Sequence, residues 1–439
     1  MRDTKAHFIG LFLSLLLFFT FFSSFSSYSQ TKNKAGTIKE CFIVSDIHFD
    51  PLYGSHNDTA LKRKLEKASF NEWKKSFESS NAQVSINANL LYNDANYGIL
   101  RSGLDNMKAK LPHPAFIIIA GDFIWHRATP ADSVLKKKTI QFIARLFKER
   151  FPGIPIIPAM GNNDTYGADY ALQDAKFLND FADAWAPNLP KAPGDELKAQ
   201  GYYTRVSGNL KLIVINSALL SYGSNYPQAD VMLKWLQTNL SGTDTKNIWI
   251  IMHIPPGLNV YSAHSFWNPD HTQTFISAVV KYSSKIKFII ASHTHFNDFR
   301  VVYNADKNPA PVAFMRFVPS ICSNHGNNPS FEVAEIESGT KRVIKETNFY
   351  LNLAAIPKDK SVTQAVWNDT LSLPSSLKLN KIDARSFSKF IDNIKTDQSR
   401  QLLDDYKKFY TVGTNIDSSI RINRVNYMKY LRADSLKGK

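Results

Sequence analysis

The 439-residue sequence predicts an α/β fold with a helical C-terminal part, and three observations support this prediction. Short apolar runs that are rich in β-branched residues recur along the chain, as buried strands do. Segments with a helical period of apolar residues lie between these runs. Apolar residues make up 44% of the chain, which is enough for a large packed core. Alternation of strands and helices is typical of α/β domains.

The predicted elements follow one another in a regular order. Six apolar runs are predicted strands, over residues 41–44, 116–120, 154–157, 212–215, 248–252 and 287–291. Helical patterns lie between them, including residues 133–151 and 229–240. Three later runs, over residues 301–303, 313–318 and 331–336, predict an antiparallel continuation of the sheet.

The pattern changes near Tyr350, where a joint containing Pro357 follows the last strand run. We therefore predict a main domain over residues 38–345 and a helical, basic subdomain over residues 346–439. Two apolar helix faces are expected in the subdomain, one formed by Phe387, Phe390, Ile391 and Ile394 and one by Leu402, Leu403, Tyr406 and Phe409. Residues 341–439 contribute +9 of the formal net charge of +15.

The first 29 residues have the composition of a secretory signal peptide. Arg2 and Lys5 precede an apolar run over residues 8–25, and small polar residues follow this run. We therefore expect the chain to be exported, either secreted or periplasmic. The run is close to the length of a membrane span, so an uncleaved N-terminal anchor is the alternative.

The cysteine content and the charge of the chain restrict its class and its partners. Two cysteines exclude a disulfide-built scaffold and a Cys-rich zinc module, although Cys41 and Cys322 could pair in an oxidising compartment.

The net charge of +15 favours an anionic partner, such as a phosphate ester, polyphosphate, nucleic acid or an anionic membrane surface. No recognised nucleic-acid motif accompanies this charge, so a nucleic-acid partner is not expected. No pattern in the chain predicts an oligomeric state.

Polar residues that can bind metal ions follow five of the predicted strands at the point where each strand ends. The runs lead, in chain order, to Asp46-Ile47-His48, Gly121-Asp122-x3-His126, Gly161-Asn162-Asn163-Asp164, His253 and His293-Thr294-His295. In an open α/β sheet, ligands bind at the carboxyl ends of the strands. These side chains are therefore expected to converge.

The residue types in these motifs suit a pair of divalent metal ions. Carboxylate, imidazole and amide oxygen are ligands for Zn, Mn or Fe(II). In D-x-H and H-x-H motifs, alternate residues of an extended segment project to the same side, so each pair can reach one site. One such motif alone is commonly a turn. Five in order predict a site at which two ions hold a phosphoryl group and activate a bridging water.

The motif set resembles that of the calcineurin-like metallophosphoesterases, and more narrowly that of the acid sphingomyelinase-like phosphodiesterase group. The narrower resemblance rests on residues 46–53, on Asn96-Tyr97-Gly98, on Asn328-Pro329-Ser330-Phe331 and on the helical tail. It extends over residues 38–420, without the saposin-like module of sphingomyelinase itself. The resemblance implies a four-layer α-β-β-α sandwich, with residues 38–345 as a binuclear catalytic domain.

The resemblance also implies which residues hold which ion. Asp46, His48, Asp122 and His295 would surround one metal ion, and Asp122, Asn162, His253 and His293 would surround the other, with Asp122 bridging the two. The expected cofactor is two divalent ions, with zinc as the first choice and manganese or iron as alternatives.

The sequence departs from the pattern of this group at Asn163, because Gly-Asn-His-Asp or Gly-Asn-His-Glu is usual there. That histidine is thought to protonate the leaving group or to stabilise the transition state. An amide donates a hydrogen bond but has no proton to give at neutral pH. His126 is then the one candidate general acid, and Asn163 is expected to stabilise developing charge. The Gly-Asn-Asn-Asp motif also resembles that of the endopolyphosphatases of the same group.

The resulting hypothesis is an exported phosphodiesterase of the sphingomyelinase-like type, in which a metal-bridging hydroxide attacks phosphorus. The substrate would be a phosphate ester or a polyanion, either a small molecule or a lipid, and the basic tail could contact a membrane surface. The alternatives are a hydrolase of polyphosphate or nucleotide phosphoanhydrides, and a catalytically weak protein that binds phosphorylated ligands.

Overall fold

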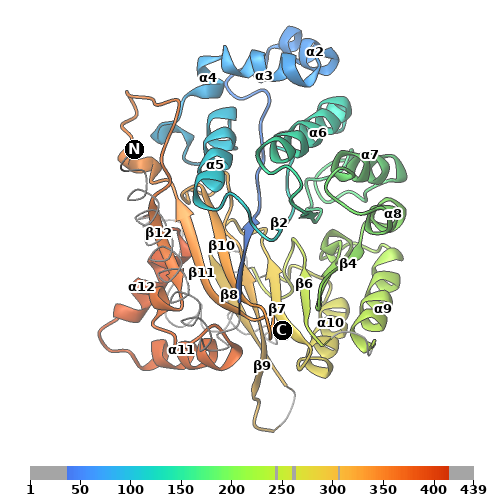
Figure 1. Cartoon of the computed structure of the whole chain (residues 1–439), viewed down its shortest axis with the longest axis vertical. Helices are drawn as coiled ribbons and strands as arrows, with labels where there is room; N and C mark the ends of the chain where they lie inside the picture. The colour runs from blue at the N-terminus through green and yellow to red at the C-terminus, as the bar shows by residue number, and fades with distance from the viewer. Residues whose placement is uncertain (1–36, 243–245, 260–263, 305–306, 415–439) are drawn as a thin grey trace, which may run out of the picture. The chain divides into compact units, whose positions relative to one another are not determined.

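The computed structural model describes residues 37–242, 246–259, 264–304 and 307–414. The predicted signal peptide and the last part of the predicted basic subdomain lie outside the described residues. The described chain contains two six-stranded sheets and the helices that cover them (Figure 1). None of its helices combines the length and the apolar character that crossing a bilayer requires.

The first sheet has the strand order β12-β11-β10-β1-β2-β3. Its members are β1 (Ile38–Val44), β2 (Ile117–Ile119), β3 (Ile156–Pro158), β10 (Ser330–Glu337), β11 (Val343–Tyr350) and β12 (Asp369–Leu373). β1, β2 and β3 pair in parallel. β10, β11 and β12 extend the sheet in antiparallel pairs, so the predicted antiparallel continuation is confirmed on this side.

The second sheet has the strand order β4-β5-β6-β7-β9-β8. Its members are β4 (Tyr203–Ser207), β5 (Leu210–Val214), β6 (Ile248–Ile251), β7 (Ile286–Ala291), β8 (Asp298–Tyr303) and β9 (Pro311–Phe317). The sequence predicts an antiparallel strand over residues 313–318, but β9 pairs in parallel with β7. The chain first forms the edge strand β8 and then returns between β8 and β7, so β9 is antiparallel to β8 and parallel to β7.

Helices form five of the connections between the described strands, and two further helices follow β12. They are α2 (Thr59–Lys67), α3 (Phe70–Glu78), α4 (Asn81–Val84), α5 (Tyr97–Lys110), α6 (Ser133–Arg150), α7 (Ala175–Trp185), α8 (Lys191–Gln200), α9 (Gln228–Ser241), α10 (Pro269–Lys281), α11 (Ala384–Thr396) and α12 (Gln401–Tyr410). The helices predicted over residues 133–151 and 229–240 correspond to α6 and α9, and their ends differ by one residue.

The two faces of the second sheet belong to different apolar cores, which fixes the order of the layers. Trp249 and Ile251 of β6 share one core with the first sheet and with α5, α6 and α7. Ile248 and Ile250 of the same strand pack into a second core with α9 and α10. Because successive strand residues point to opposite faces, the layers run helix, sheet, sheet, helix. The predicted α-β-β-α sandwich is confirmed.

The C-terminal part departs from the helical pattern predicted for residues 346–439. The strand β11 runs across the predicted boundary at residue 346, and β12 adds another strand to the first sheet. In β12 the buried Leu371 and Leu373 flank a half-buried serine, a period-two pattern too short to recognise in the sequence. The predicted helices α11 and α12 do form, and Phe387 of α11 packs against Phe299 and Phe314 of the second sheet.

A buried group of ionisable side chains joins the two sheets. The Nε atom of Arg316 on β9 lies 2.7 Å from Glu346 Oε2, and its Nη2 atom lies 3.1 Å from Glu332 Oε1. Both glutamates belong to the first sheet, and all three side chains are almost completely excluded from solvent. Burial and the charge of Glu346 raise the pKa of Glu332 to about 8. Arg316 therefore provides the positive charge that balances carboxylates inside the β–β interface.

Replacing Arg316 with Met should lower the free energy of unfolding by about 3 kcal/mol, because it leaves a buried carboxylate without its partner. The triple replacement Arg316→Met, Glu332→Gln and Glu346→Gln should recover much of this loss, since no buried charge remains. Urea denaturation followed by circular dichroism would measure both. A triple variant less stable than Arg316→Met would contradict the electrostatic explanation.

Candidate metal centre

All seven predicted metal ligands come together at one edge of the two sheets. They follow the carboxyl ends of β1, β2 and β3 in the first sheet and of β6 and β7 in the second. The seven are Asp46, His48, Asp122, Asn162, His253, His293 and His295. His293 is half-buried, and the other six are at most 3% exposed.

The carboxylate of Asp122 lies at the centre of this group. Its Oδ2 atom is 3.4 Å from His48 Nε2 and 3.1 Å from His253 Nε2. The same His253 nitrogen is 3.1 Å from Asn162 Oδ1. Asp122 thus contacts ligands predicted for each of the two ions, which is the position that a bridging carboxylate needs.

The second carboxylate, that of Asp46, divides its two oxygens between different partners. The hydroxyl of Ser292 donates a hydrogen bond to Oδ2. The other oxygen, Oδ1, lies 3.5 Å from His295 Nε2 and 3.8 Å from His48 Nε2. Ser292 therefore holds the carboxylate so that one oxygen faces the imidazole groups.

The arrangement fits divalent cations. Among the described residues, the buried atoms Asp46 Oδ1 and His48 Nε2 have no hydrogen-bond partner. Such groups are costly to bury unless something else satisfies them. Ligand atoms of Asp46, His48 and Asp122 lie within 4.8 Å of one another, and those of Asp122, His253 and His293 form a second such set. Two overlapping sets that share Asp122 match a pair of sites with one common carboxylate.

The backbone of the ligand loops is strained. The φ angles are +46° at Asp46, +38° at His48, +57° at Asp122, +71° at His293 and +64° at His295. Residues other than glycine rarely adopt this left-handed region, and functional sites are where such strain is found. The D-x-H and H-x-H pairs therefore reach one site as predicted, but through left-handed turns and not through an extended segment.

Two glycines make the approach of the loops possible. A Cβ atom on Gly121 would lie 2.8 Å from His253 Nδ1, and the φ angle there is +98°. A Cβ atom on Gly161 would lie 2.0 Å from Asp122 Oδ1. The glycines of the Gly-Asp and Gly-Asn motifs are thus required by close contact with the ligands and, at Gly121, by the backbone angle as well.

Backbone carbonyl groups fix the orientation of two ligand imidazoles. His48 Nδ1 lies 2.8 Å from the carbonyl oxygen of Ile124, and His253 Nδ1 lies 2.8 Å from that of Ala120. A carbonyl oxygen only accepts, so each Nδ1 must carry the proton and donate it. In the neutral form of each ring, the Nε2 lone pair can then bind a cation, which is the usual arrangement of metal-binding histidines.

Neighbouring charges shift the pKa values of these groups. Burial lowers the pKa of His253, but the carboxylates of Asp122 and Asp46 outweigh it and raise the value to about 9. Burial likewise acts against the charged form of Asp122, yet His253 and His48 hold its pKa well below the usual range. Burial and the neighbouring His253 lower the pKa of His293 to about 3. Asp122 is therefore ionised and His293 neutral, as ligands must be.

Asp164, the last residue of the Gly-Asn-Asn-Asp motif, holds two ligand loops together. Its carboxylate accepts hydrogen bonds from the backbone N–H groups of Asp122 (2.9 Å), Phe123 (2.9 Å) and Gly161 (2.8 Å). Burial and the charge of Asp122 raise the pKa of Asp164 to about 6. This residue positions the loops after β2 and β3.

A loop that the sequence motifs do not include supports the second set of ligands. Asn162 Nδ2 donates to Asp169 Oδ1 at 2.7 Å, which turns the amide oxygen of Asn162 toward His253. The hydroxyl of Tyr170 lies 3.1 Å from His293 Nε2. Sequence reasoning missed both residues, because no recognised spacing connects this loop to the ligands.

The predicted general acid His126 lies beside the cluster and is oriented by Asp94. Its ring stacks on that of His48, with a centroid distance of 3.8 Å. Asp94 Oδ1 lies 2.5 Å from His126 Nδ1, and Asp94 Oδ2 accepts from the His126 backbone N–H at 2.9 Å. Burial raises the pKa of Asp94, but the hydrogen bond with His126 prevails and lowers it. Sequence reasoning missed Asp94, which precedes the quoted Asn96-Tyr97-Gly98 segment by two residues.

Asn163 faces the central carboxylate. Its backbone N–H donates to Asp122 Oδ1 at 2.9 Å, and its Nδ2 donates to Asp122 Oδ2 at 3.0 Å. The amide therefore stabilises the charge of Asp122. Its predicted role toward the developing charge on a substrate would use the second N–H of the same amide group.

The cysteines do not pair in this structure. Cys41 and Cys322 are both free and buried. Cys322 Sγ lies 3.4 Å from His295 Nδ1, so this thiol packs behind a predicted ligand. The ring of His325 also contacts that of His295 edge to face, with a centroid distance of 4.4 Å.

Comparison with known proteins agrees with the geometry. Residues 41–297 match the family model described as calcineurin-like phosphoesterase. The matched span contains every predicted ligand, from Asp46 to His295.

The chain is also similar to curated phosphodiesterases. It is 26% identical over 401 residues to cyclic GMP-AMP phosphodiesterase SMPDL3A of Bos taurus, an alignment that covers 86% of this chain and 84% of that protein. It is 26% identical over 341 residues to sphingomyelinase phosphodiesterase C of Dictyostelium discoideum, covering 71% of this chain and 72% of that protein. Sphingomyelin phosphodiesterase 2 of Caenorhabditis elegans is 25% identical, with 72% of this chain and 53% of that protein covered.

Replacing Asp122 with Ala should remove both metal ions, because this carboxylate contacts both sets of ligands. Elemental analysis of the purified protein should find about two equivalents of divalent metal in the parent chain and close to none in the variant. Asp50→Asn is the matched control, since Asp50 is a buried carboxylate outside the cluster. Retention of one full equivalent by Asp122→Ala would show that the carboxylate does not bridge.

Proposed function

Since this chain belongs to the calcineurin-like phosphoesterase family, we propose that it is an exported, metal-dependent phosphodiesterase of the acid sphingomyelinase-like type. The observation that carries the proposal is the His126–Asp94 pair, which lies against the predicted ligand His48. A proton donor beside a metal centre is what expulsion of a poor alkoxide leaving group requires. The relatives named above as phosphodiesterases support the choice of a diester.

The seven ligands would hold two divalent ions. When bound, the ions supply positive charge to the phosphoryl oxygens and lower the pKa of a water molecule. The combination of carboxylate, imidazole and amide oxygen supports zinc as the first candidate, with manganese or iron as alternatives. Asp164 keeps the loops that carry Asp122 and Asn162 at a fixed separation, so the ligands are positioned before a substrate arrives.

His126 would deliver the proton to the leaving oxygen. Its Nδ1 atom is engaged by Asp94, so the proton must come from Nε2. Stacking on His48 and the contact with Asp94 fix the plane of the ring. The side chain is 31% exposed, which leaves an edge of the ring accessible to a substrate and to proton exchange with solvent.

Asn163 supports a second candidate, hydrolysis of a phosphoanhydride. An alkoxide is a strongly basic leaving group, because the pKa of its conjugate acid is close to that of water, about 15.7. A phosphate leaving group is much less basic, because the relevant pKa is about 6. A phosphate therefore leaves without much help from an acid. Asn163 provides an amide where a second acid is usual. This change should therefore lower the rate of hydrolysis less for an anhydride than for an alkyl diester.

Export is supported by the composition of residues 1–29. Sequencing the N-terminus of protein recovered from outside the producing cells would test this part of the proposal. A mature chain that begins close to residue 30 supports it, and an intact Met1 opposes it.

Replacing His126 with Ala should lower kcat on an alkyl phosphodiester by about 10²- to 10⁴-fold and leave the metal content unchanged. The loss should be much smaller on bis-p-nitrophenyl phosphate, because p-nitrophenolate is a weakly basic leaving group. Steady-state kinetics on the two substrates would measure the difference. Equal losses on both substrates would show that His126 binds the substrate and does not transfer a proton.

Asp94→Asn is the companion variant, because it keeps the size of the side chain and removes its charge. It should lower kcat less than His126→Ala and change the pH dependence of kcat, since Asp94 acts through the His126 ring. An unchanged pH profile with intact metal content would remove Asp94 from the mechanism.

A substrate panel would separate the two candidate functions. The purified protein, loaded with Zn²⁺ or Mn²⁺, should hydrolyse bis-p-nitrophenyl phosphate and a natural diester, such as sphingomyelin or cyclic GMP-AMP, faster than ATP or polyphosphate. Asn163→His should raise kcat on the diester by about tenfold or more, as a second acid would, and change kcat on ATP little. Hydrolysis of polyphosphate alone would favour the second candidate.

A further inference from the structure

A cavity of about 590 Å³ lies at the end of the sheets opposite to the candidate metal centre. It is bordered by the first residues of β7, β9 and β11 and by the beginning of α11. Lys287 stands near the start of β7, whereas His293 follows its end. His293 comes six positions after Lys287, which corresponds to about 20 Å of extended chain. A ligand in this cavity would therefore not touch the metal ligands.

The lining of this distal cavity is strongly basic. It contains two lysines and two arginines, from three different parts of the chain: Lys287, Arg342, Lys381 and Arg385. The one carboxylate in the lining, that of Asp383, already accepts a hydrogen bond from the Ser386 N–H and pairs with Lys381 at 3.1 Å. Within the part of the chain that the structure describes, neither arginine has a carboxylate within salt-bridge distance. The cavity thus holds positive charge that its own residues do not balance.

The local environment adds to this positive potential. Lys287 and Arg342 line the same cavity, and burial and the charge of Arg342 lower the pKa of Lys287. Arg385 lies in the first turn of the 13-residue helix α11, where unpaired N–H groups give the helix a partial positive charge. An anion in the cavity would reduce the repulsion between Lys287 and Arg342 and would interact favourably with the N-terminal turn of α11.

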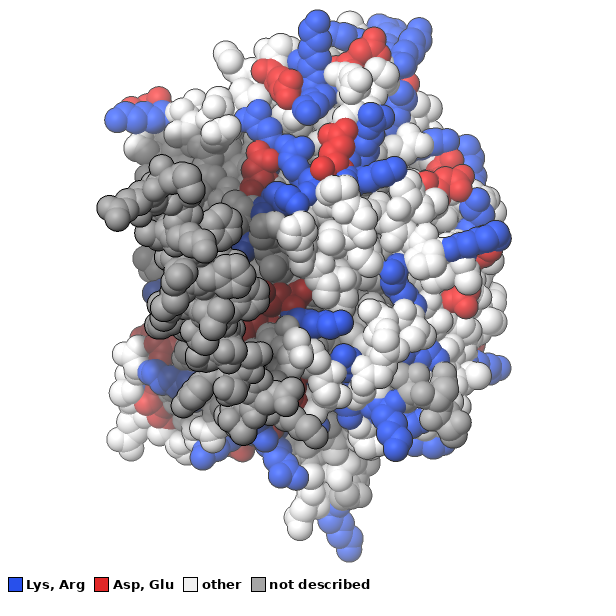
Figure 2. Space-filling view, in the orientation of Figure 1, with Lys and Arg blue, Asp and Glu red and all other residues white. Residues whose placement is uncertain are grey.

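The basic residues of the cavity are gathered in one place, although Arg342, Lys381 and Arg385 are exposed to solvent. Basic side chains are spread over the visible face of the molecule and do not gather in one patch (Figure 2). In the distal cavity, by contrast, four basic residues line one hollow, together with apolar residues such as the buried Phe288 and Phe314. Cations around one hollow attract an anion more strongly than the same cations spread over a surface.

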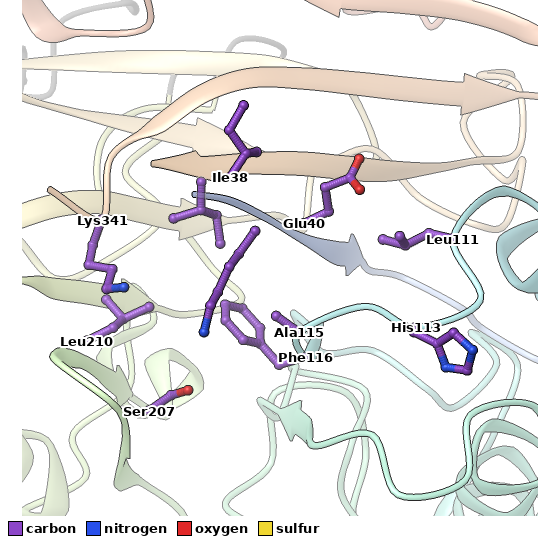
Figure 3. Close-up of a pocket in the computed structure, with 11 residues that line it drawn as sticks. Ile38, Glu40, Leu111, His113, Ala115, Phe116, Ser207, Leu210 and Lys341 are labelled. Carbon is purple, nitrogen blue, oxygen red and sulfur yellow. The ribbon is translucent and has the colours of Figure 1, made fainter. Parts of the chain in front are cut away.

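A second cavity at the same end, of about 420 Å³, provides a contrast (Figure 3). Its lining includes Lys39 and Lys341, but also the carboxylate of Glu40, and it contains no arginine. Figure 3 shows Glu40 and Lys341 among the residues that line this cavity, and they stand apart from each other. The smaller cavity therefore lacks the excess of guanidinium groups found in the distal cavity.

We propose that the distal cavity binds a doubly charged phosphate group, either free, as in a diphosphate, or carried by the headgroup of a phosphomonoester lipid. Guanidinium groups bind phosphate oxygens through two parallel hydrogen bonds, and the cavity offers two of them beside two ammonium groups. No metal-binding cluster belongs to its lining, so the bound group is held and not hydrolysed there. The site would anchor the enzyme to a phosphate-rich polymer or surface while the opposite end carries out the reaction.

The test compares the double variant Arg342→Gln/Arg385→Gln with the parent chain, both loaded with metal. The probe is methylenediphosphonate, which resists hydrolysis, and isothermal titration calorimetry counts the equivalents bound. The parent should bind one equivalent more than the variant, or the variant should bind that equivalent at least about tenfold more weakly. Equal stoichiometry and affinity in the two proteins would overturn the proposal.

The matched control is Lys39→Gln/Lys345→Gln, which removes the same amount of charge at the same end of the sheets but outside the distal cavity. This control should bind methylenediphosphonate as the parent does. If it lost as much binding as Arg342→Gln/Arg385→Gln, the effect would come from the overall charge, and the proposal of a defined site would be refuted. Both double variants should retain the parent kcat/KM on bis-p-nitrophenyl phosphate, which shows that they are folded and separates this test from the proposed catalytic function.

A sedimentation assay with phosphatidylcholine vesicles, with and without phosphatidic acid, identifies the source of the phosphate. Binding that requires phosphatidic acid and disappears in Arg342→Gln/Arg385→Gln supports a lipid headgroup. Binding of methylenediphosphonate without binding of either vesicle supports a free phosphate ligand. Binding of neither the diphosphonate nor the phosphatidic acid vesicles by the parent chain would refute the proposal.

Discussion

The buried carboxylate of Asp164 is the contact on which the metal centre depends, because it connects the loops after β2 and β3. It accepts backbone hydrogen bonds from Asp122 and Phe123 in one loop and from Gly161 in the other. Two short parallel strands cannot fix the separation of the loops that follow them. The Asp164 carboxylate fixes this separation, because it accepts hydrogen bonds from both loops. It therefore also fixes the position of the central ligand Asp122.

The strained backbone of the ligands shows how the rest of the fold supports this contact. Five of the seven predicted ligands have positive φ angles, each of which costs of order 1–3 kcal/mol. Such conformations persist only where the surroundings determine them fully. Here both sheets enclose the loops, and backbone carbonyl groups hold His48 and His253. The packing of the sandwich thus offsets the strain that keeps the ligands in position. Bound cations would offset a further part of this strain.

Local signals in the sequence were sufficient to predict the α/β class and the seven residues that converge, whereas the layered arrangement was implied by the family resemblance. A buried parallel strand is a continuous apolar run, and the residue after its carboxyl end lies at the functional edge. Asp94 and Asp169 could not be found in this way. Asp94 contacts His126 across 32 residues of sequence and lies in an irregular segment, where no periodicity relates a residue to its neighbours in space. β12 was missed because its burial depends on pairing with β11 and not on its own composition.

The charge distribution at the metal centre indicates the order in which metal and substrate bind. The ligands Asp46 and Asp122 stand close to three further carboxylates, those of Asp94, Asp164 and Asp169. Protons on His48 and His253, whose pKa values are raised to about 10 and about 9, at most balance part of this negative charge. A phosphate ester is itself an anion, so the ligands alone would repel it, although the whole chain carries +15. Divalent ions in place of these protons would make the local charge less negative, so metal binding before substrate binding would reduce the repulsion of a phosphorylated substrate.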